Sequence, residues 1–429
     1  MSDKSPQINQ LNQNNMTQVI IKNIRILDVD KEDPSSPSMI RIEDGRFHTI
    51  NTEAGDAPAN DAVVIDGEGL FALPGLIDCH AHPFLADTNL ARLNQVPPTL
   101  MTARAVNILE KMLMRGFTTI RDATGADWGM KQAVEEGAVI GPRLFIAGRA
   151  LSQTGGHGDF RSKTDIGVAC SCSHALAYTS RIADGADEVR KAVREELRQG
   201  ADQIKIMVSG GVSSPNDPLE CDQYSPEEIR IIVEEARRRG TYVMAHAYGA
   251  SAIKMAVAEG VRTIEHGNLL DQEAAELMAE KEAFLVPTLI TYNVLEEEGR
   301  RNGWDQVMLD KLKVVKDAGL KSLEICRSVG VQIGLGTDLL GDSFDHQSRE
   351  FVVRSEIESS RETIRSATRV NAKILNQEGQ LGVIQEGAIA DVLLLQGNPF
   401  TEPEVLQNQG EKIPIIIKAG KIVKNSMSS

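Results

Sequence analysis

The sequence predicts an α/β protein, a (β/α)8 barrel of the TIM type joined to a small β-sandwich domain. Two observations predict this architecture. Eight apolar strand-like segments alternate with amphipathic helical segments through the middle of the chain. Short strands with period-two hydrophobicity, separated by Asp-Gly and Gly turns, stand at both ends. A chain of 429 residues can bury the cores of one large and one small domain. A doubly wound open sheet is the competing arrangement of the central segments.

Four regions follow one another along the chain. Residues 1–17 are rich in Gln and Asn, which predicts a flexible leader. Residues 18–74 predict a small antiparallel sheet, and residues 385–429 return to the same pattern, so we expect both chain ends to build one composite β-domain. The barrel then spans residues 75–384. Its predicted strands are "GLIDCHAH" (75–82), "GFTTIRDAT" (116–124), "RLFIAG" (143–148), "ADQIKIMVSGG" (201–211), "TYVMAHAYG" (241–249), "RTIEHGN" (262–268), "AFLVPTL" (283–289) and "VQIGLGTD" (331–338).

Local signals support individual elements. The segment "SPEEIRIIVEEARRRG" (225–240) begins with a Ser that can cap a helix, followed by Pro and two Glu, and it ends on Arg and Gly. The spacing predicts an amphipathic helix that covers one face of the barrel.

Charge and composition indicate which classes of binding partner and which location to expect. Lys and Arg number 46 against 61 Asp and Glu, a net charge of −15, which argues against nucleic acid or an anionic membrane as the main partner. No secretory h-region or membrane-spanning apolar run is present, and five cysteines do not form a disulfide framework, so we expect a cytoplasmic protein. Cys170 and Cys172 are better explained as two reduced thiols in a loop than as a soft-metal site.

Histidines gather where barrel enzymes place their chemistry. The chain has eight histidines, and four of them end predicted strands: His80, His82, His246 and His266. Residues at i and i+2 of a strand point to the same side, so the H-x-H pair aims two imidazoles at one point. Asp338 ends the last predicted strand. Four imidazoles and a carboxylate form the donor set of a divalent ion such as Zn²⁺.

Two of these positions allow another explanation. Asp338 follows a strand and could cap a helix, but its place at the last strand end favours a metal-bound general base. Lys205 lies in the fourth predicted strand. An ammonium buried beside metal ions would be costly, and the other explanation is a lysine that extends its ammonium to solvent at the barrel rim.

The motifs "DCHAH", "QIKIMVSGG", "AHAYG", "EHGN" and "GTD", in this order, resemble the amidohydrolase superfamily of metal-dependent hydrolases. The tail "GVIQEGAIADVLLL" followed by "NP" is similar to that of the superfamily, and the likeness runs from about residue 18 to the end. Within the superfamily, "GGHGD" and "AHAYG" look most like the Xaa-Pro dipeptidase and carboxypeptidase-like branch. That branch is often labelled imidazolonepropionase-like, and it includes ochratoxin-hydrolysing amidases.

The resemblance implies a ligand set and a reaction. Two divalent ions, with Zn²⁺ expected, would be bound: one by His80, His82 and Asp338, the other by His246 and His266. Lys205, as N6-carboxylysine, would bridge them. A metal-activated hydroxide would cleave a C–N amide bond, and Asp338 would pass the proton to the leaving nitrogen. The expected partner is a small-molecule amide: an Xaa-Pro dipeptide or an N-acyl or aryl amino-acid amide. The resemblance also implies a homo-oligomer.

Three further residues are candidates for contacting the substrate. Tyr248 lies two residues after His246 and is either a substrate contact or a packed rim aromatic. His157 lies in the glycine-rich stretch "TGGHGDF" and either approaches a ligand or stays on the surface. Arg121 either pairs with a substrate carboxylate or supports the barrel through an ion pair.

Other reactions remain open at this stage. A lactonase, phosphotriesterase or carbamate hydrolase can use the same binuclear centre, because the centre prepares hydroxide whatever the leaving group. A mononuclear deaminase or imidazolone-type ring hydrolase is disfavoured by Lys205, since such relatives lack the bridging lysine. A scaffold without catalysis is disfavoured by the complete ligand set.

Overall fold

The computed structural model describes residues 18–51, 62–88, 93, 96–162, 164, 179–214, 217–301 and 303–427. The predicted leader (1–17) and the pair Cys170 and Cys172 lie outside these ranges. Among the helices of the described ranges, none combines the length and the apolar composition that crossing a membrane requires.

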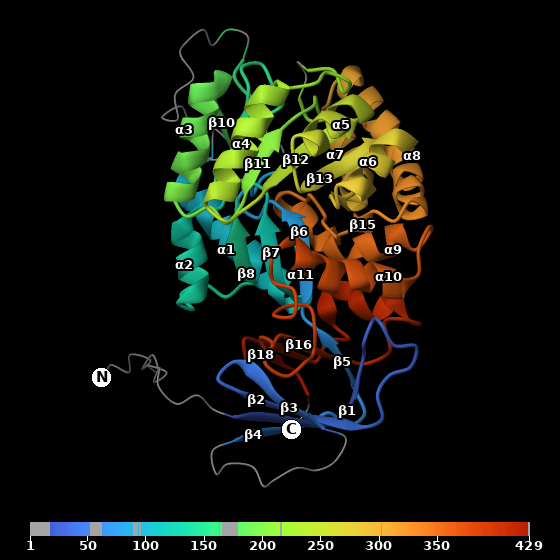
Figure 1. The fold of residues 1–429 in the computed structure, drawn as a ribbon. Helices are drawn as coiled ribbons and strands as arrows, with labels where there is room; N and C mark the ends of the chain where they lie inside the picture. The colour runs from blue at the N-terminus through green and yellow to red at the C-terminus, as the bar shows by residue number, and fades with distance from the viewer. Residues whose placement is uncertain are drawn as a thin grey trace, which may run out of the picture.

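One mixed sheet is built from both ends of the chain (Figure 1). Its strand order is β18-β17-β16-β5-β1-β2-β3, and β4 pairs with β1 outside this path. The strands are β1 (Val19–Ile26), β2 (Ser38–Glu43), β3 (Arg46–Asn51), β4 (Val63–Asp66), β5 (Phe71–Pro74), β16 (Val392–Leu395), β17 (Ile415–Lys418) and β18 (Lys421–Asn425). The antiparallel sheet expected from the sequence is wrong in one respect, because β1 runs parallel to both β4 and β5.

The central strands are parallel and form two sheets. Every predicted barrel segment overlaps one strand, and the two short strands β9 and β10 were not predicted. The first sheet contains β6 (Leu76–Ala81), β7 (Phe117–Asp122) and β8 (Arg143–Ile146). The second sheet has the order β10-β9-β11-β12-β13-β14-β15. Its strands are β9 (Ala150–Ser152), β10 (Ser180–Ile182), β11 (Ile204–Met207), β12 (Val243–Gly249), β13 (Thr263–Leu269), β14 (Phe284–Val286) and β15 (Gln332–Ile333).

Hydrogen bonds on both sides link the two parallel sheets where the strand ladders stop. On one side, Cys79 N donates to Leu335 O at 2.8 Å, and on the other, Asp202 N donates to Ile146 O at 2.7 Å. The last predicted strand, 331–338, is shorter than expected. Beyond β15 the chain turns, because Thr337 N and Asp338 N both donate to the single carbonyl of His80.

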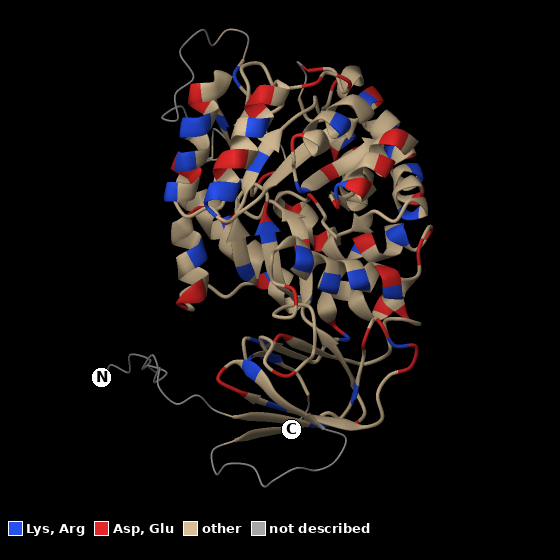
Figure 2. Ribbon diagram, in the orientation of Figure 1, with Lys and Arg blue, Asp and Glu red and all other residues tan. Residues whose placement is uncertain are grey.

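Helices follow the parallel strands and lie outside them (Figure 1). They are α1 (Pro98–Met114), α2 (Trp128–Glu135), α3 (Gly185–Arg198), α4 (Pro226–Arg238), α5 (Ala250–Ala258), α6 (Gln272–Glu280), α7 (Leu289–Arg301), α8 (Gln306–Ser328), α9 (Glu350–Arg354), α10 (Ser360–Arg365) and α11 (Asn371–Ile374). The predicted N-cap of α4 at Ser225 is confirmed, and Ser225 and Glu228 each bond the other's backbone N–H. Acidic and basic side chains are interspersed along these outer helices (Figure 2), as expected for faces in contact with water.

The mixed sheet packs against the base of the parallel strands. Leu73 and Leu393 of the mixed sheet share one apolar cluster with Phe117 of β7 and Leu335. Only Gly75 separates β5 from β6, and the carboxyl end of β6 points away from the mixed sheet (Figure 1). The apolar cluster therefore supports the strands at the end opposite to the one that carries the histidines.

Candidate metal centre and active site

A cavity lies at the carboxyl ends of the parallel strands. Eight of the nine site residues predicted from the sequence line it: His80, His82, His157, Lys205, His246, Tyr248, His266 and Asp338. They lie on β6 and directly after it, on β11, β12 and β13, on the turn after β15 and on the segment after β9. Parallel strands bring these distant residues together because their carboxyl ends meet at one end of the barrel-like assembly.

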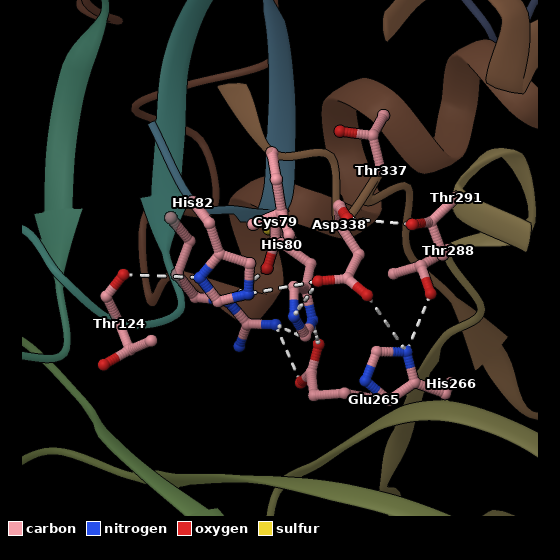
Figure 3. Close-up of polar contacts among 12 residues, drawn as sticks. Cys79, His80, His82, Thr124, Glu265, His266, Thr288, Thr291, Thr337 and Asp338 are labelled. Atoms are coloured by element: carbon pink, nitrogen blue, oxygen red, sulfur yellow. Dashed lines mark hydrogen bonds and ion pairs between the residues drawn. The ribbon is translucent and has the colours of Figure 1, made fainter. Parts of the chain in front are cut away.

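Asp338 lies between the imidazole rings (Figure 3). Its Oδ1 is 3.1 Å from His82 Nε2 and 3.4 Å from His80 Nε2, and its Oδ2 is 4.0 Å from His266 Nδ1. His80, His266 and Asp338 offer ligand atoms that lie within 4.8 Å of one another, close enough to bind one ion. The structure therefore contains a candidate metal site at these three residues.

The other ring nitrogens of His80 and His82 are already bonded. His80 Nδ1 lies 2.7 Å from Glu265 Oε2, and His82 Nδ1 lies 3.3 Å from the carbonyl oxygen of Thr124. Both acceptors require a proton on Nδ1, so Nε2 is the ring nitrogen that each histidine turns toward Asp338. His80 Nε2 is buried and has no hydrogen-bond partner. This arrangement is typical of metal-binding histidines, so the residues present fit a divalent ion.

Burial sets the protonation of the site. It lowers the pKa of His246 and of His266 well below the usual range, because an imidazolium is poorly solvated there. Both rings are therefore neutral near pH 7, the form that binds metal. Burial alone would raise the pKa of Asp338, but the neighbouring His80 and His82 outweigh it and hold that pKa well below the usual range.

Lys205 lies on β11 and lines the same cavity as the four candidate histidine ligands. Its side chain is almost fully buried, and burial lowers its pKa to about 8 despite the nearby carboxylates of Glu265 and Asp338. An ammonium in this position is costly because it loses its hydration. The alternative of a lysine that reaches solvent at the barrel rim does not hold, since Lys205 is only 2% exposed.

Two of the candidate ligands have an unusual backbone. His266 has φ +74° and Asp338 has φ +53°, in the left-handed region that side chains other than Gly seldom adopt. Local contacts hold both: His266 Nδ1 lies 2.8 Å from Thr288 Oγ1, and Thr291 Oγ1 donates to Asp338 O at 3.0 Å. Such backbone strain is concentrated at functional sites.

Arg121 does not line the cavity, which corrects its candidacy as a substrate contact. Its guanidinium is fully buried beneath the site and donates to both carboxylate oxygens of Glu265, at 2.9 and 3.1 Å, and to Cys79 O at 2.6 Å. This geometry is that of the second explanation given for Arg121, an ion pair that supports the barrel. Burial would raise the pKa of Glu265, but Arg121 and His80 lower it to about 2, so the carboxylate stays ionised.

Tyr248 and His157 flank the candidate ligands. Tyr248 stacks on His266 with ring centroids 5.3 Å apart, and its hydroxyl lies 3.3 Å from the hydroxyl of Tyr292. Tyr292 also donates to Asn268 Oδ1 at 3.0 Å. His157 stacks on His246 at 4.3 Å. Both rings therefore face the same cavity as the candidate ligands.

Sequence reasoning missed the residues that support the site. Glu265 orients His80, and Thr124 and Thr288 orient His82 and His266. A glutamate inside the apolar segment "RTIEHGN" was a usable signal, because a buried carboxylate needs partners. The two threonines gave no signal, since threonine is common in strands.

Comparison with known proteins agrees with this architecture. Residues 71–423 match the model of the amidohydrolase family, and the chain belongs to that family. It is a hydrolase that acts on C–N bonds.

The chain is similar to two solved peptidases and to one curated hydrolase. A prolidase solved in complex with N-methylphosphonate-L-proline is 46% identical, with a TM-score of 0.92 over 95% of this chain and 100% of the other. A Xaa-Pro dipeptidase with methionine bound in its active site is 29% identical, with a TM-score of 0.84 over 95% and 100%. Ochratoxinase of Aspergillus niger is 34% identical over 82% of this chain and 75% of its own length.

Proposed function

We propose that the protein is a binuclear metal-dependent amidohydrolase whose substrate is a small dipeptide of the Xaa-Pro type. The observation that carries the proposal is the convergence of four histidines, Lys205 and Asp338 on one cavity. The 46% identity to a prolidase with a proline phosphonate bound supports this substrate class. N-acyl or aryl amino-acid amides are the second candidate class, supported by the 34% identity to ochratoxinase.

The chain offers two groups of ligands. His80, His82 and Asp338 would hold one ion, His246 and His266 the other, and Lys205 as N6-carboxylysine would bridge them. Zn²⁺ is the expected ion because imidazole and carboxylate suit it. Two such ions supply Lewis acidity and a hydroxide at neutral pH.

The protein's own groups then handle the proton and the substrate. Asp338, with its side chain 23% exposed to the cavity, accepts the proton of the attacking water and passes it to the leaving nitrogen. His157 and Tyr248 present polar atoms to the substrate's carbonyl or carboxylate. Apolar side chains complete the wall and suit a substrate with an apolar residue: Leu85, Phe160, Met207, Val212, Leu295 and Leu340.

The wider organisation forms part of the same proposal. The eight parallel strands predicted from the sequence would form a closed (β/α)8 barrel over residues 75–384, with residues 18–74 and 385–429 as the composite β-domain. A cytoplasmic location and a homo-oligomer stay predictions.

The test measures bound metal and hydrolysis together. Wild type, Lys205→Ala and the control Lys254→Ala, whose side chain is 31% exposed, are grown with added Zn²⁺ and assayed for metal content. Each protein is then given Xaa-Pro dipeptides, N-acyl amino acids, lactones and phosphotriesters. We expect close to two ions per chain and dipeptide hydrolysis in wild type and in the control. In Lys205→Ala we expect loss of metal and a fall in kcat of more than about 100-fold, since even outer contacts to a metal ligand are worth 10–100-fold.

Other results point elsewhere. One ion per chain, or full activity of Lys205→Ala, contradicts the bridged centre and favours the mononuclear deaminase or imidazolone-type hydrolase. Turnover confined to lactones or phosphotriesters contradicts the amide substrate while leaving the metal centre intact.

A further inference from the structure

A buried aspartate outside the candidate ligand set faces the ring of His157. Asp217 Oδ2 lies 3.5 Å from His157 Nδ1, which is ion-pair range, and the buried Nδ1 has no hydrogen-bond partner; Asp217 is only 4% exposed. The same oxygen accepts from Gly211 N and from Gln223 Nε2, both at 3.2 Å. Burial would raise the pKa of Asp217, but the contacts with His157, Ser214 and Lys311 outweigh it and lower that pKa. A fixed, ionised carboxylate thus stands behind the imidazole.

The ring of His157 is held on several sides. Its backbone N–H donates to Gln223 Oε1 at 2.9 Å, which ties His157 to the residue that also binds Asp217. Its ring stacks on His246 with an interplanar angle of 19°. Gly211 leaves the space that the ring fills, because a Cβ at that position would lie 2.0 Å from His157 Cε1.

A lysine on α8 anchors the backbone that carries Asp217. Lys311 Nζ donates to three carbonyl oxygens, those of Gly211 (3.2 Å), Ser214 (2.8 Å) and Asp217 (2.5 Å). Charged donors make strong hydrogen bonds to carbonyls. The position of the carboxylate therefore depends on a helix that follows β14 in the chain and contributes no candidate ligand.

We propose that Asp217 is a positioning residue for His157: its carboxylate, fixed by Gly211 N, Gln223 and Lys311, holds the ring plane and the Nδ1–H tautomer. The Nε2 atom of His157 is then left for the substrate. A carboxylate facing one ring nitrogen favours a proton on that nitrogen and so leaves the other nitrogen free. The inference rests on the proposed function in one respect, that the ligand of His157 is the amide substrate.

The test is a double-mutant cycle read on kcat and KM. Asp217→Asn, His157→Asn and the double variant are compared on the dipeptide that wild type cleaves best. Asp222→Asn, an exposed aspartate on the same segment, is the matched control and should behave as wild type. In the wild-type background we expect Asp217→Asn to lower kcat/KM by about 10-fold, the smallest loss that is usual when a supporting contact is removed. In the His157→Asn background the same substitution should lower kcat/KM by less than about 2-fold. An equal loss in both backgrounds overturns the proposal.

A second readout needs no substrate. The ¹⁵N signals of the His157 ring, assigned by their loss in His157→Asn, should show one fixed tautomer in the zinc-loaded wild type and tautomer averaging in Asp217→Asn. Gly211→Ala, which crowds the ring, should displace the same signals with Asp217 intact. Unchanged signals in Asp217→Asn overturn the proposal even if its activity falls. A wild type inert toward every dipeptide contradicts the proposed function, whereas the ring signals still decide the role of Asp217.

Discussion

Glu265→Gln tests the buried network beneath the metal site. The substitution keeps the shape of the side chain but replaces one carboxylate oxygen by an NH₂ group. In the structure both oxygens are surrounded by donors: His80 Nδ1 at 2.7 Å, Arg121 Nη2 at 2.9 and 3.1 Å, and Thr263 Oγ1 at 2.5 Å. The NH₂ group of the glutamine would face the N–H and O–H donors of these neighbours, and the charge of Arg121 would have no compensating anion.

The expected loss of stability follows from the burial of both partners. Arg121 and Glu265 are each 0% exposed, and breaking a buried ion pair by removing one charge costs about 3–5 kcal/mol. The entropy of unfolding is about 2.1 cal/mol/K per residue, or about 0.9 kcal/mol/K for this chain, so Tm should fall by about 3–6 °C. His80 also loses its orienting acceptor, so zinc affinity should fall by about 10–100-fold.

Calorimetry and zinc titration measure the two effects. Glu273→Gln removes an exposed partner of Lys254 and serves as the matched control, with no measurable change in Tm expected. The double variant Arg121→Met with Glu265→Gln should be less destabilised than the sum of the single variants. A Tm and a zinc affinity equal to those of wild type in Glu265→Gln would refute the role given to this network.

Three further predictions concern other parts of the molecule. Glu350 accepts a hydrogen bond from Ile290 N at 2.7 Å, and burial raises the pKa of Glu350 to about 7 from 4.5. The native state therefore binds a proton at Glu350 more tightly than the unfolded state does. The stability that protonated Glu350 contributes is full below pH 4.5 and is lost as the pH rises through 7. Urea unfolding at several pH values should show that Glu350→Gln lacks this part of the pH dependence of stability. Identical pH profiles for wild type and Glu350→Gln would contradict the prediction. Chelation of the zinc-loaded protein should lower Tm, since a ligand at 100 times its Kd adds about 2.7 kcal/mol, and added Zn²⁺ should restore it. Asp391→Ala should cost about 1.5–3 kcal/mol without loss of metal, because Asp391 bonds Arg143 at 2.7 Å far from the histidines; metal loss in that variant would argue against this separation.

Much of the fold could be predicted from the sequence, since its main features follow local rules. The i, i+2 spacing brought His80 and His82 to one side, and the capping residues of α4 fixed its start at Pro226. The eight strand segments were recognisable from their apolar runs.

What escaped prediction depends on contacts between distant segments. Pairing partners are set by the assembled sheet, so the parallel pairing of β1 with β4 and β5 left no local pattern. The link of Asp217 to His157 joins residues 60 positions apart, and the pairing of Arg121 with Glu265 spans more than twice that distance. A sequence pattern gives residue types and spacing, and neither specifies such partners.

The pairing of β5 with β16 also has a consequence for biosynthesis. These strands pair Ala72 with Leu394, more than 300 residues later in the chain. On the ribosome, the edge of β5 therefore stays without its neighbour until nearly the whole polypeptide has emerged. Long-range pairing of this kind slows folding and leaves a sheet edge open to other chains. A nascent or truncated chain that stops before Val392 would expose this edge, and such chains should depend most on chaperones.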